Sequence, residues 1–200
     1  PRKLFNQKAA EALLTAAKYA ANHCSRAKRK LAIRGHFVIH LGLAAGLRVS
    51  EMQNLRCGDL YLDEHPSFLF VRCGKGKKTR TVYFNRAFTL HCRQYLAWKQ
   101  RRGEPTDEDS YMFFSDRIEG PVCTRTLQKT FKRCAKLAGF PEYYSIHSLR
   151  HTYACLLLKA GDWNLRLVQK QLGHSRITIT EVYADVMPPD IKKALTKLPI

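Results

Sequence analysis

The chain has 200 residues, enough for a domain with a buried core, and 45% of them are hydrophobic. Lys and Arg number 35 against 16 Asp and Glu, which gives a formal net charge of +19. This excess disfavours an enzyme of neutral metabolites and favours a polyanionic partner, with nucleic acid the first candidate and an acidic membrane surface the second. No apolar run approaches the roughly 20 residues of a membrane-spanning helix, so the sequence disfavours a membrane protein.

The cysteines are odd in number, widely spread and without any C-x-x-C spacing. This pattern predicts reduced, mostly buried thiols rather than disulfides or a zinc site. The set consists of Cys24, Cys57, Cys73, Cys92, Cys123, Cys134 and Cys155.

The first third of the chain predicts two helices. Asn6 to Cys24 is rich in alanine and leucine at helical spacing. Gly35 to Gly46 is apolar on one face and closes with glycine, a common helix stop, which puts Arg48 near the join to the next helix. Between them, Ser25 to Arg34 is strongly basic and is either a solvated helix start or a phosphate-facing patch. The candidate phosphate contacts in this run are Lys28, Arg29 and Lys30.

The pattern changes at Phe68, where an apolar stretch, a Gly- and Lys-rich turn and a second alternating stretch predict a β-hairpin with a basic tip. Helical spacing returns from Arg86 to Arg102, and the acidic stretch Glu104 to Ser110 predicts an exposed loop. Further helices are predicted at Thr124–Ala138, His147–Ala160 and Asn164–Leu172, each followed by a glycine. The predicted fold class is therefore mainly α with a small antiparallel β-sheet (α+β).

A basic cluster opens the helix predicted at His147. His147, Arg150 and His151 are spaced i, i+3 and i+4, so they share one helix face. For an isolated H-x-x-R-H run, a solvated basic face would be the preferred interpretation. The rest of the chain favours a site instead, because it adds Arg48, His174 and a phenol at Tyr183.

This combination suits attack on a phosphodiester. A phenol with a pKa near 10 is a poor nucleophile until positive charge and a proton acceptor stabilise its phenolate. Two guanidinium groups and two imidazoles would supply both at Tyr183, and arginine forks match the oxygens of a phosphate. The leaving oxygen also needs a general acid, for which Lys75 at the hairpin tip is the best candidate and Lys77 and Lys78 are competitors. From the pattern alone, a plain phosphate contact is the preferred interpretation of each of these lysines.

Taken together, the motifs resemble the catalytic domain of the tyrosine recombinases, the phage-integrase family. They run Gly46-Leu47-Arg48-x-Ser50-Glu51, Gly74-Lys75-Gly76, His147-x-x-Arg150-His151, Leu172-Gly173-His174-Ser175 and Tyr183. The resemblance spans nearly the whole chain and is specific in order and spacing. It implies the integrase catalytic-domain fold and a site-specific recombinase, an enzyme that cleaves and rejoins DNA strands.

The resemblance also implies a role for each site residue. Arg48, Arg150 and His174 would hold the scissile phosphate, and Lys75 would be the general acid. His147 would accept a proton or donate a hydrogen bond beside it, and Tyr183 would form a 3′-phosphotyrosyl bond. The supporting residues would be Glu51 and His151, and Arg80 would join Lys77 and Lys78 on the DNA backbone. No metal ion, ATP or other cofactor is expected in this chemistry.

Partners and organisation follow from the same resemblance. We expect double-stranded DNA as substrate, a homo-tetramer on two duplexes, a monomer or weak dimer when free, and accessory DNA-bending proteins. The tail Asp190 to Leu198 has the apolar spacing of a helix that docks on a neighbour or on its own domain. We expect residues 1–200 to be a single catalytic domain without the usual N-terminal core-binding domain, in either a fragment or a single-domain member. The expected location is the cytoplasm and nucleoid of a bacterium, encoded by host or phage.

Three rivals share some of these features. A type IB topoisomerase would use the same chemistry to nick and reseal one duplex, but the compact H-x-L-R-H and the short His-to-Tyr gap favour the recombinase. A catalytically silent DNA-binding regulator is disfavoured because every catalytic position is filled. A metal-dependent nuclease is set aside for want of paired carboxylates or an H-x-x-H motif.

Overall fold

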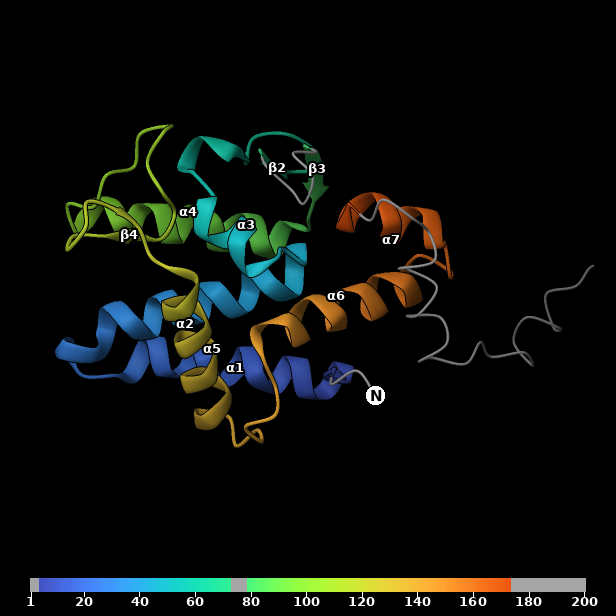
Figure 1. Ribbon diagram of the computed structural model, residues 1–200, viewed down its shortest axis with the longest axis horizontal. Coiled ribbons are helices and arrows are strands. Elements are labelled where there is room, and N and C mark those ends of the chain that lie inside the picture. The colour runs from blue at the N-terminus through green and yellow to red at the C-terminus, as the bar shows by residue number, and fades with distance from the viewer. Residues whose placement is uncertain (1–3, 73–78, 174–200) are drawn as a thin grey trace, which may run out of the picture.

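The computed structural model describes residues 4–72 and 79–173, where helices dominate and the strands form two small antiparallel sheets (Figure 1). This confirms the predicted fold class. The helices are α1 (Gln7–His23), α2 (Arg26–Ala45), α3 (Val49–Asn54), α4 (Arg86–Arg101), α5 (Thr124–Leu137), α6 (Ile146–Ala160) and α7 (Leu165–Leu172). The strands are β1 (Leu60–Tyr61), β2 (Phe68–Val71), β3 (Arg80–Tyr83), β4 (Phe114–Ser115) and β5 (Gly120–Pro121).

Helix α2 is the centre of the fold. It packs against α1, α4, α5 and α6, as Figure 1 shows. Phe37 and Leu41 of α2 are completely buried, and the Phe37 ring stacks on Tyr95 of α4 with centroids 4.0 Å apart. Because its neighbours hold α2 on several sides, the turn that follows its C-terminal end is also fixed in place.

Helix α2 runs without a break from Arg26 to Ala45, so the basic run from Ser25 to Arg34 forms the first half of the helix predicted at Gly35 to Gly46. A Cβ on Gly35 would lie 2.7 Å from Sγ of Cys134 in α5, and one on Gly42 would lie 2.6 Å from Cδ1 of Leu149 in α6. These glycines mark close helix crossings rather than helix ends.

The predicted hairpin is confirmed by the antiparallel pairing of β2 with β3, in which Phe68 faces Tyr83 and Val71 faces Arg80. Strand β1 extends this sheet on the other side of β2, and β4 pairs with β5 in a separate sheet. Neither addition was predicted, because strands of two residues carry no readable periodicity.

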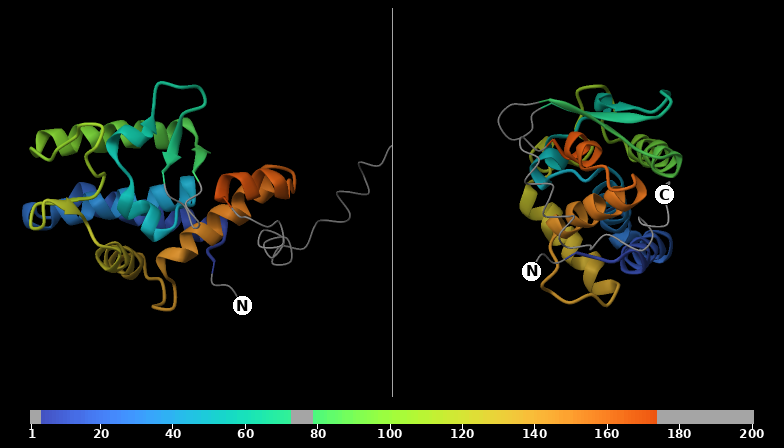
Figure 2. Two further views of the ribbon diagram at one scale, coloured as in Figure 1. Left: turned by 45° about the horizontal axis from the view of Figure 1, so that its top comes forward. Right: turned by 90° about the vertical axis from the view of Figure 1, so that its right-hand side faces the viewer.

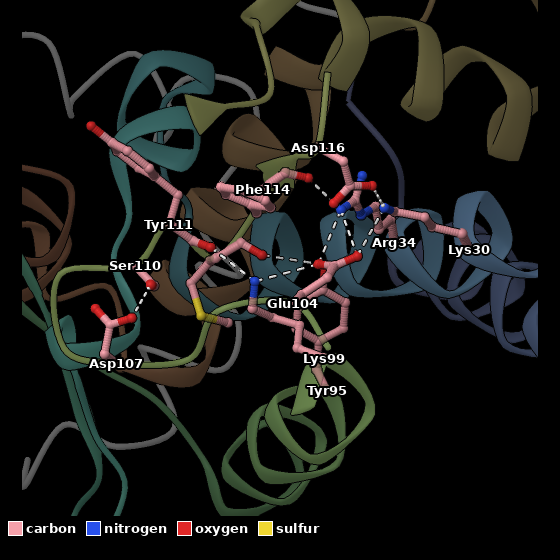
Figure 3. A network of polar contacts seen from close by, with 11 residues as sticks. Lys30, Arg34, Tyr95, Lys99, Glu104, Asp107, Ser110, Tyr111, Phe114 and Asp116 are labelled. Carbon is pink, nitrogen blue, oxygen red and sulfur yellow. Dashed lines mark hydrogen bonds and ion pairs between the residues drawn. The ribbon is translucent and has the colours of Figure 1, made fainter. Parts of the chain in front are cut away.

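The prediction that Glu104 to Ser110 is an exposed loop is wrong at its first residue, since Glu104 is only 5% exposed. Its carboxylate accepts hydrogen bonds from Arg34 at 3.0 and 3.1 Å and from the fully buried Lys99 at 3.4 Å (Figure 3). Lys30 adds an ion pair at 3.0 Å. Buried cations need a counter-charge, and Glu104 supplies it.

Helices α6 and α7 form a smaller core of their own, in which Tyr153 and Leu158 pack with Val168 and Leu172. Helix α7 lies beside both α6 and strand β3 (Figures 1 and 2). The Nε of Arg80 donates to the Gln171 carbonyl at 3.0 Å, which fastens the end of α7 to the sheet. Within the ranges described, no helix is long and apolar enough to cross a membrane.

Candidate active site

Arg48 is positioned by the sharp turn between α2 and α3. Gly46 ends α2 in the left-handed conformation (φ 59°), and a Cβ there would lie 2.3 Å from Cδ1 of Tyr153, so only glycine fits. Arg48 then caps α3, and Glu51 in the first turn of this helix accepts a hydrogen bond from the Arg48 backbone N–H at 2.8 Å. The turn therefore fixes the Arg48 backbone and the Glu51 carboxylate together.

Glu51 is the hub of the site, with a side chain only 2% exposed. Nη1 of Arg48 donates to its Oε1 at 2.7 Å. The fork of Arg80 donates to both carboxylate oxygens, each at 2.8 Å. Nη1 of Arg150 lies 3.8 Å from Oε2. Three guanidinium groups thus surround one carboxylate, and they come from the N-cap of α3, from β3 and from α6.

The protonation of Glu51 follows from this environment. Burial by itself would raise the pKa of the carboxyl, but the hydrogen bonds and charge of Arg80 outweigh it, helped by the Arg48 backbone N–H and the charge of Arg150. The net result lowers the pKa of Glu51 to about 2. Glu51 therefore stays ionised at neutral pH and holds the arginines in fixed positions.

Arg150 links three segments of the chain. It is buried in α6, and its two terminal nitrogens donate to the Gly46 carbonyl at 2.6 Å and the Leu172 carbonyl at 2.7 Å. These carbonyls belong to the ends of α2 and α7, which leave backbone acceptors unpaired at their last turns. Arg150 therefore brings the Arg48 turn and the segment before His174 to the same place.

Arg80 was predicted to contact the DNA backbone. In the structure its side chain is only 9% exposed, and its guanidinium group donates two hydrogen bonds to Glu51. This is the supporting arginine that sequence reasoning missed. The sequence of β3 could have indicated this role, because side chains alternate between the two faces of a strand and Arg80 lies on the same face as the buried Val82. A Cβ on Gly173 would lie 2.7 Å from Cδ of Arg80, so Arg80 also fixes the end of α7.

The structure places His147, Arg150 and His151 on α6, but not on one displayed face. His147 is exposed in the first turn, His151 is half-buried and Arg150 is buried. The expected cationic face is therefore split, because Arg150 turns inward to the carbonyls of Gly46 and Leu172.

Several predicted site residues lie outside the described ranges. These are Lys75, Lys77 and Lys78 between β2 and β3, and His174, Tyr183 and the tail from Asp190 to Leu198 beyond α7. The described chain stops at Gly173, one residue before His174 and next to the Leu172 carbonyl that binds Arg150.

The basic run of α2 is not part of this cluster. Lys28 and Arg29 are exposed, and Lys30 forms ion pairs with Glu104 at 3.0 Å and Asp116 at 2.5 Å. At 1.5 Å per residue, the run lies about 25 Å along α2 from the turn that carries Arg48. It is a separate surface and not a second wall of the arginine site.

Comparison with known proteins identifies the family. The model of the phage integrase family matches residues 3–188. The chain belongs to this family. Among curated relatives, the tyrosine recombinase XerC of Caldanaerobacter subterraneus subsp. tengcongensis is 34% identical over 168 residues, which cover 84% of this chain and 45% of that protein. The tyrosine recombinase XerD of Rickettsia conorii is 33% identical over 186 residues, covering 89% of this chain and 60% of that protein.

Solved structures of the family agree with the fold. A crystal structure of the XerA recombinase matches with a TM-score of 0.75 and 25% identity, covering 98% of this chain and 63% of that one. A post-cleavage complex of the XerH site-specific recombinase with palindromic difH substrate matches with a TM-score of 0.78 and 23% identity, covering 98% of this chain and 53% of that one. The chain thus spans about half the length of these relatives.

Proposed function

We propose that this chain is the catalytic part of a site-specific DNA recombinase. The observation that carries the proposal is the convergence of Arg48 and Arg150, which are about a hundred positions apart in sequence, on the single carboxylate of Glu51. Two rigid guanidinium groups are what a phosphodiester needs when negative charge gathers on its non-bridging oxygens. Membership of the phage integrase family and the Xer recombinases among its relatives support the same function.

In the proposed reaction, the Tyr183 phenolate attacks the phosphorus of one DNA strand. A phosphotyrosyl bond to the 3′ side forms, the bond from phosphorus to the 5′ oxygen breaks, and Lys75 gives that oxygen a proton. Arg48, Arg150 and His174 stabilise the phosphate oxygens, while His147 accepts the phenolic proton of Tyr183 or donates a hydrogen bond beside it. His151 and Glu51 support these residues, and the 5′ hydroxyl of another strand reverses the steps and rejoins the DNA.

The proposed partner is double-stranded DNA, on which four copies exchange strands between two duplexes with the help of DNA-bending proteins. The net charge of +19 supports a polyanionic substrate. The XerH structure was solved with its difH substrate, which supports DNA as the partner of this fold.

A trapping experiment tests the nucleophile. The chain is incubated with nicked duplexes of random sequence, in which cleavage releases a short fragment and leaves the protein attached. We expect a covalent protein–DNA adduct on denaturing gels, and sequencing of the attached DNA would give the target site. Tyr183→Phe should abolish the adduct while DNA binding persists, because only the phenolic oxygen is lost.

Tyr19→Phe is the matched control, since Tyr19 is exposed on α1, and it should form adduct at the unaltered rate. An adduct that survives Tyr183→Phe would refute the nucleophile. With the trapped site in hand, strand exchange between two labelled duplexes supports a recombinase, whereas relaxation of supercoils without a second site would favour the topoisomerase alternative.

A further inference from the structure

A cluster of three histidines lies between α2 and α4, away from the arginine site. His36 and His40 are one turn apart on α2, so they share a face, and His91 comes from the facing helix α4. One ring nitrogen from each of the three lies within 4.8 Å of the other two. His40 lies five residues before Ala45, the last residue of α2, which is about 8 Å along the helix.

The rings are packed against one another rather than spread over a surface. His91 is buried, and His36 and His40 are half-buried. The ring centroids of His36 and His91 are 4.1 Å apart, and Nδ1 of His40 is 2.8 Å from Nδ1 of His91. In the part of the chain that the structure describes, this is the only hydrogen bond that joins the three rings.

We propose that His36, His40 and His91 bind one divalent transition-metal ion, for which zinc fits best. Zinc binds imidazole nitrogens at about 2.0–2.1 Å in tetrahedral geometry, so two ligand nitrogens stand about 3.3 Å apart. The 2.8 Å contact between His40 and His91 has to open by about 0.5 Å, and a nitrogen pair at the 4.8 Å limit of the cluster has to close by about 1.5 Å, for which the rings rotate. Three neutral nitrogen ligands favour zinc, nickel or copper over magnesium or calcium, which prefer oxygen.

The fourth ligand has access from the surface. A hollow of about 690 Å³ is lined by His36 and His91, and basic side chains including Lys18, Arg26 and Arg29 form its walls. These cations weaken the binding of a bare dication, and they favour hydroxide or another small anion as the fourth ligand. The ion would tie α2 to α4 and stabilise the folded chain, while the DNA chemistry remains free of metal.

Spectroscopy with cobalt tests the proposal directly. The chain is freed of metal with a chelator and titrated with Co²⁺ and then Zn²⁺, beside the variants His91→Asn and His36→Asn. The control is His23→Asn, because His23 is exposed on α1 and outside the cluster. We expect one ion per chain, a visible spectrum of tetrahedral cobalt that zinc abolishes, and a higher Tm with zinc.

The variants should bind zinc at least tenfold more weakly, whereas His23→Asn should bind normally. His36 is less buried than His91, so His36→Asn keeps the test valid if His91→Asn does not fold. Equal zinc affinity in the cluster variants and the control would overturn the proposal. Charge-transfer absorption from cobalt–thiolate bonds would also overturn it, since the ligands would then be cysteines, and so would the lack of saturable binding.

Discussion

Two buried glutamates, each surrounded by basic groups, serve different ends in this molecule. Glu104 is held by Arg34, Lys99 and Lys30, and Lys99 is fully buried with its remaining hydrogen bond on the Tyr111 carbonyl (Figure 3). Glu51 is held by Arg48, Arg80 and Arg150. Exposure does not separate the two clusters, because the Arg48 side chain is 24% exposed and the Lys30 side chain 27%.

The difference lies in where the cations sit. Arg34 and Lys99 lie within the long helices α2 and α4. Both pair with Glu104, so their charges serve to hold α2 to α4 and to the loop that follows α4. Arg48 caps α3 directly after a glycine turn. Arg150 binds the carbonyls at the ends of α2 and α7, so both charges lie where the chain changes direction. A buried ion pair by itself is thus weak evidence of function, and its position at element ends is the informative feature.

The largest expected effect separates the two glutamates. Glu51→Gln and Glu104→Gln each leave buried cations without their counter-charge, which should lower the free energy of unfolding by about 4 kcal/mol. Only Glu51→Gln should also slow covalent adduct formation per folded molecule, because only there are the arginines of the site released. Urea unfolding and single-turnover cleavage measure the two effects. Equal loss of cleavage in both variants would contradict the distinction.

Acid should remove the contribution of Glu51 in a defined range. Its pKa is about 2 in the folded chain against 4.5 for an ordinary glutamate, so the unfolded chain takes up the proton first as the pH falls. The stabilisation is complete above about pH 4.5 and is lost as the pH falls towards 2. It amounts to about 3 kcal/mol. The difference in unfolding free energy between the wild-type chain and Glu51→Gln should narrow over this range, and a constant difference would argue against an ionised Glu51.

The basic run of α2 should have the smallest effect. If Lys28 and Arg29 bind phosphates, replacing both with Gln should reduce the slope of log K against log salt by about 0.9 for each lost contact. Cleavage of bound DNA should be unchanged, because this run lies far along α2 from Arg48. Lys8→Gln, an exposed change on α1, is the control. An unchanged slope would favour the interpretation of this run as a solvated helix start.

Sequence patterns predicted local structure well, and they failed where the partner was distant in the chain. Helical spacing located α1, α4, α5, α6 and α7 to within a residue or two. The role of Gly35 depends on Cys134, and the burial of Glu104 depends on Arg34, which is 70 positions earlier. No local pattern carries such information.

The site shows the same division. Arg48 and Glu51 belong to one short motif, so their pairing could be predicted from the sequence. The hydrogen bond of Arg80 to Glu51 joins a strand to a helix 29 positions earlier, and no local pattern indicates it. The histidine cluster is similar, because His36 and His40 have visible helical spacing but His91 joins them only through the packing of α4 on α2.

The central claim is that the paired arginines act on the non-bridging oxygens of one phosphate, and a substrate with one such oxygen replaced by methyl tests it most directly. On ordinary DNA, Arg150→Lys should slow single-turnover adduct formation by about 10² to 10³, because a point charge cannot reproduce the arginine fork. Arg133→Lys, an exposed change on α5, should have no effect. On the methylphosphonate, the penalty of Arg150→Lys should shrink to a few-fold, since the charge that the fork stabilises is gone. An equal penalty on both substrates would contradict the account.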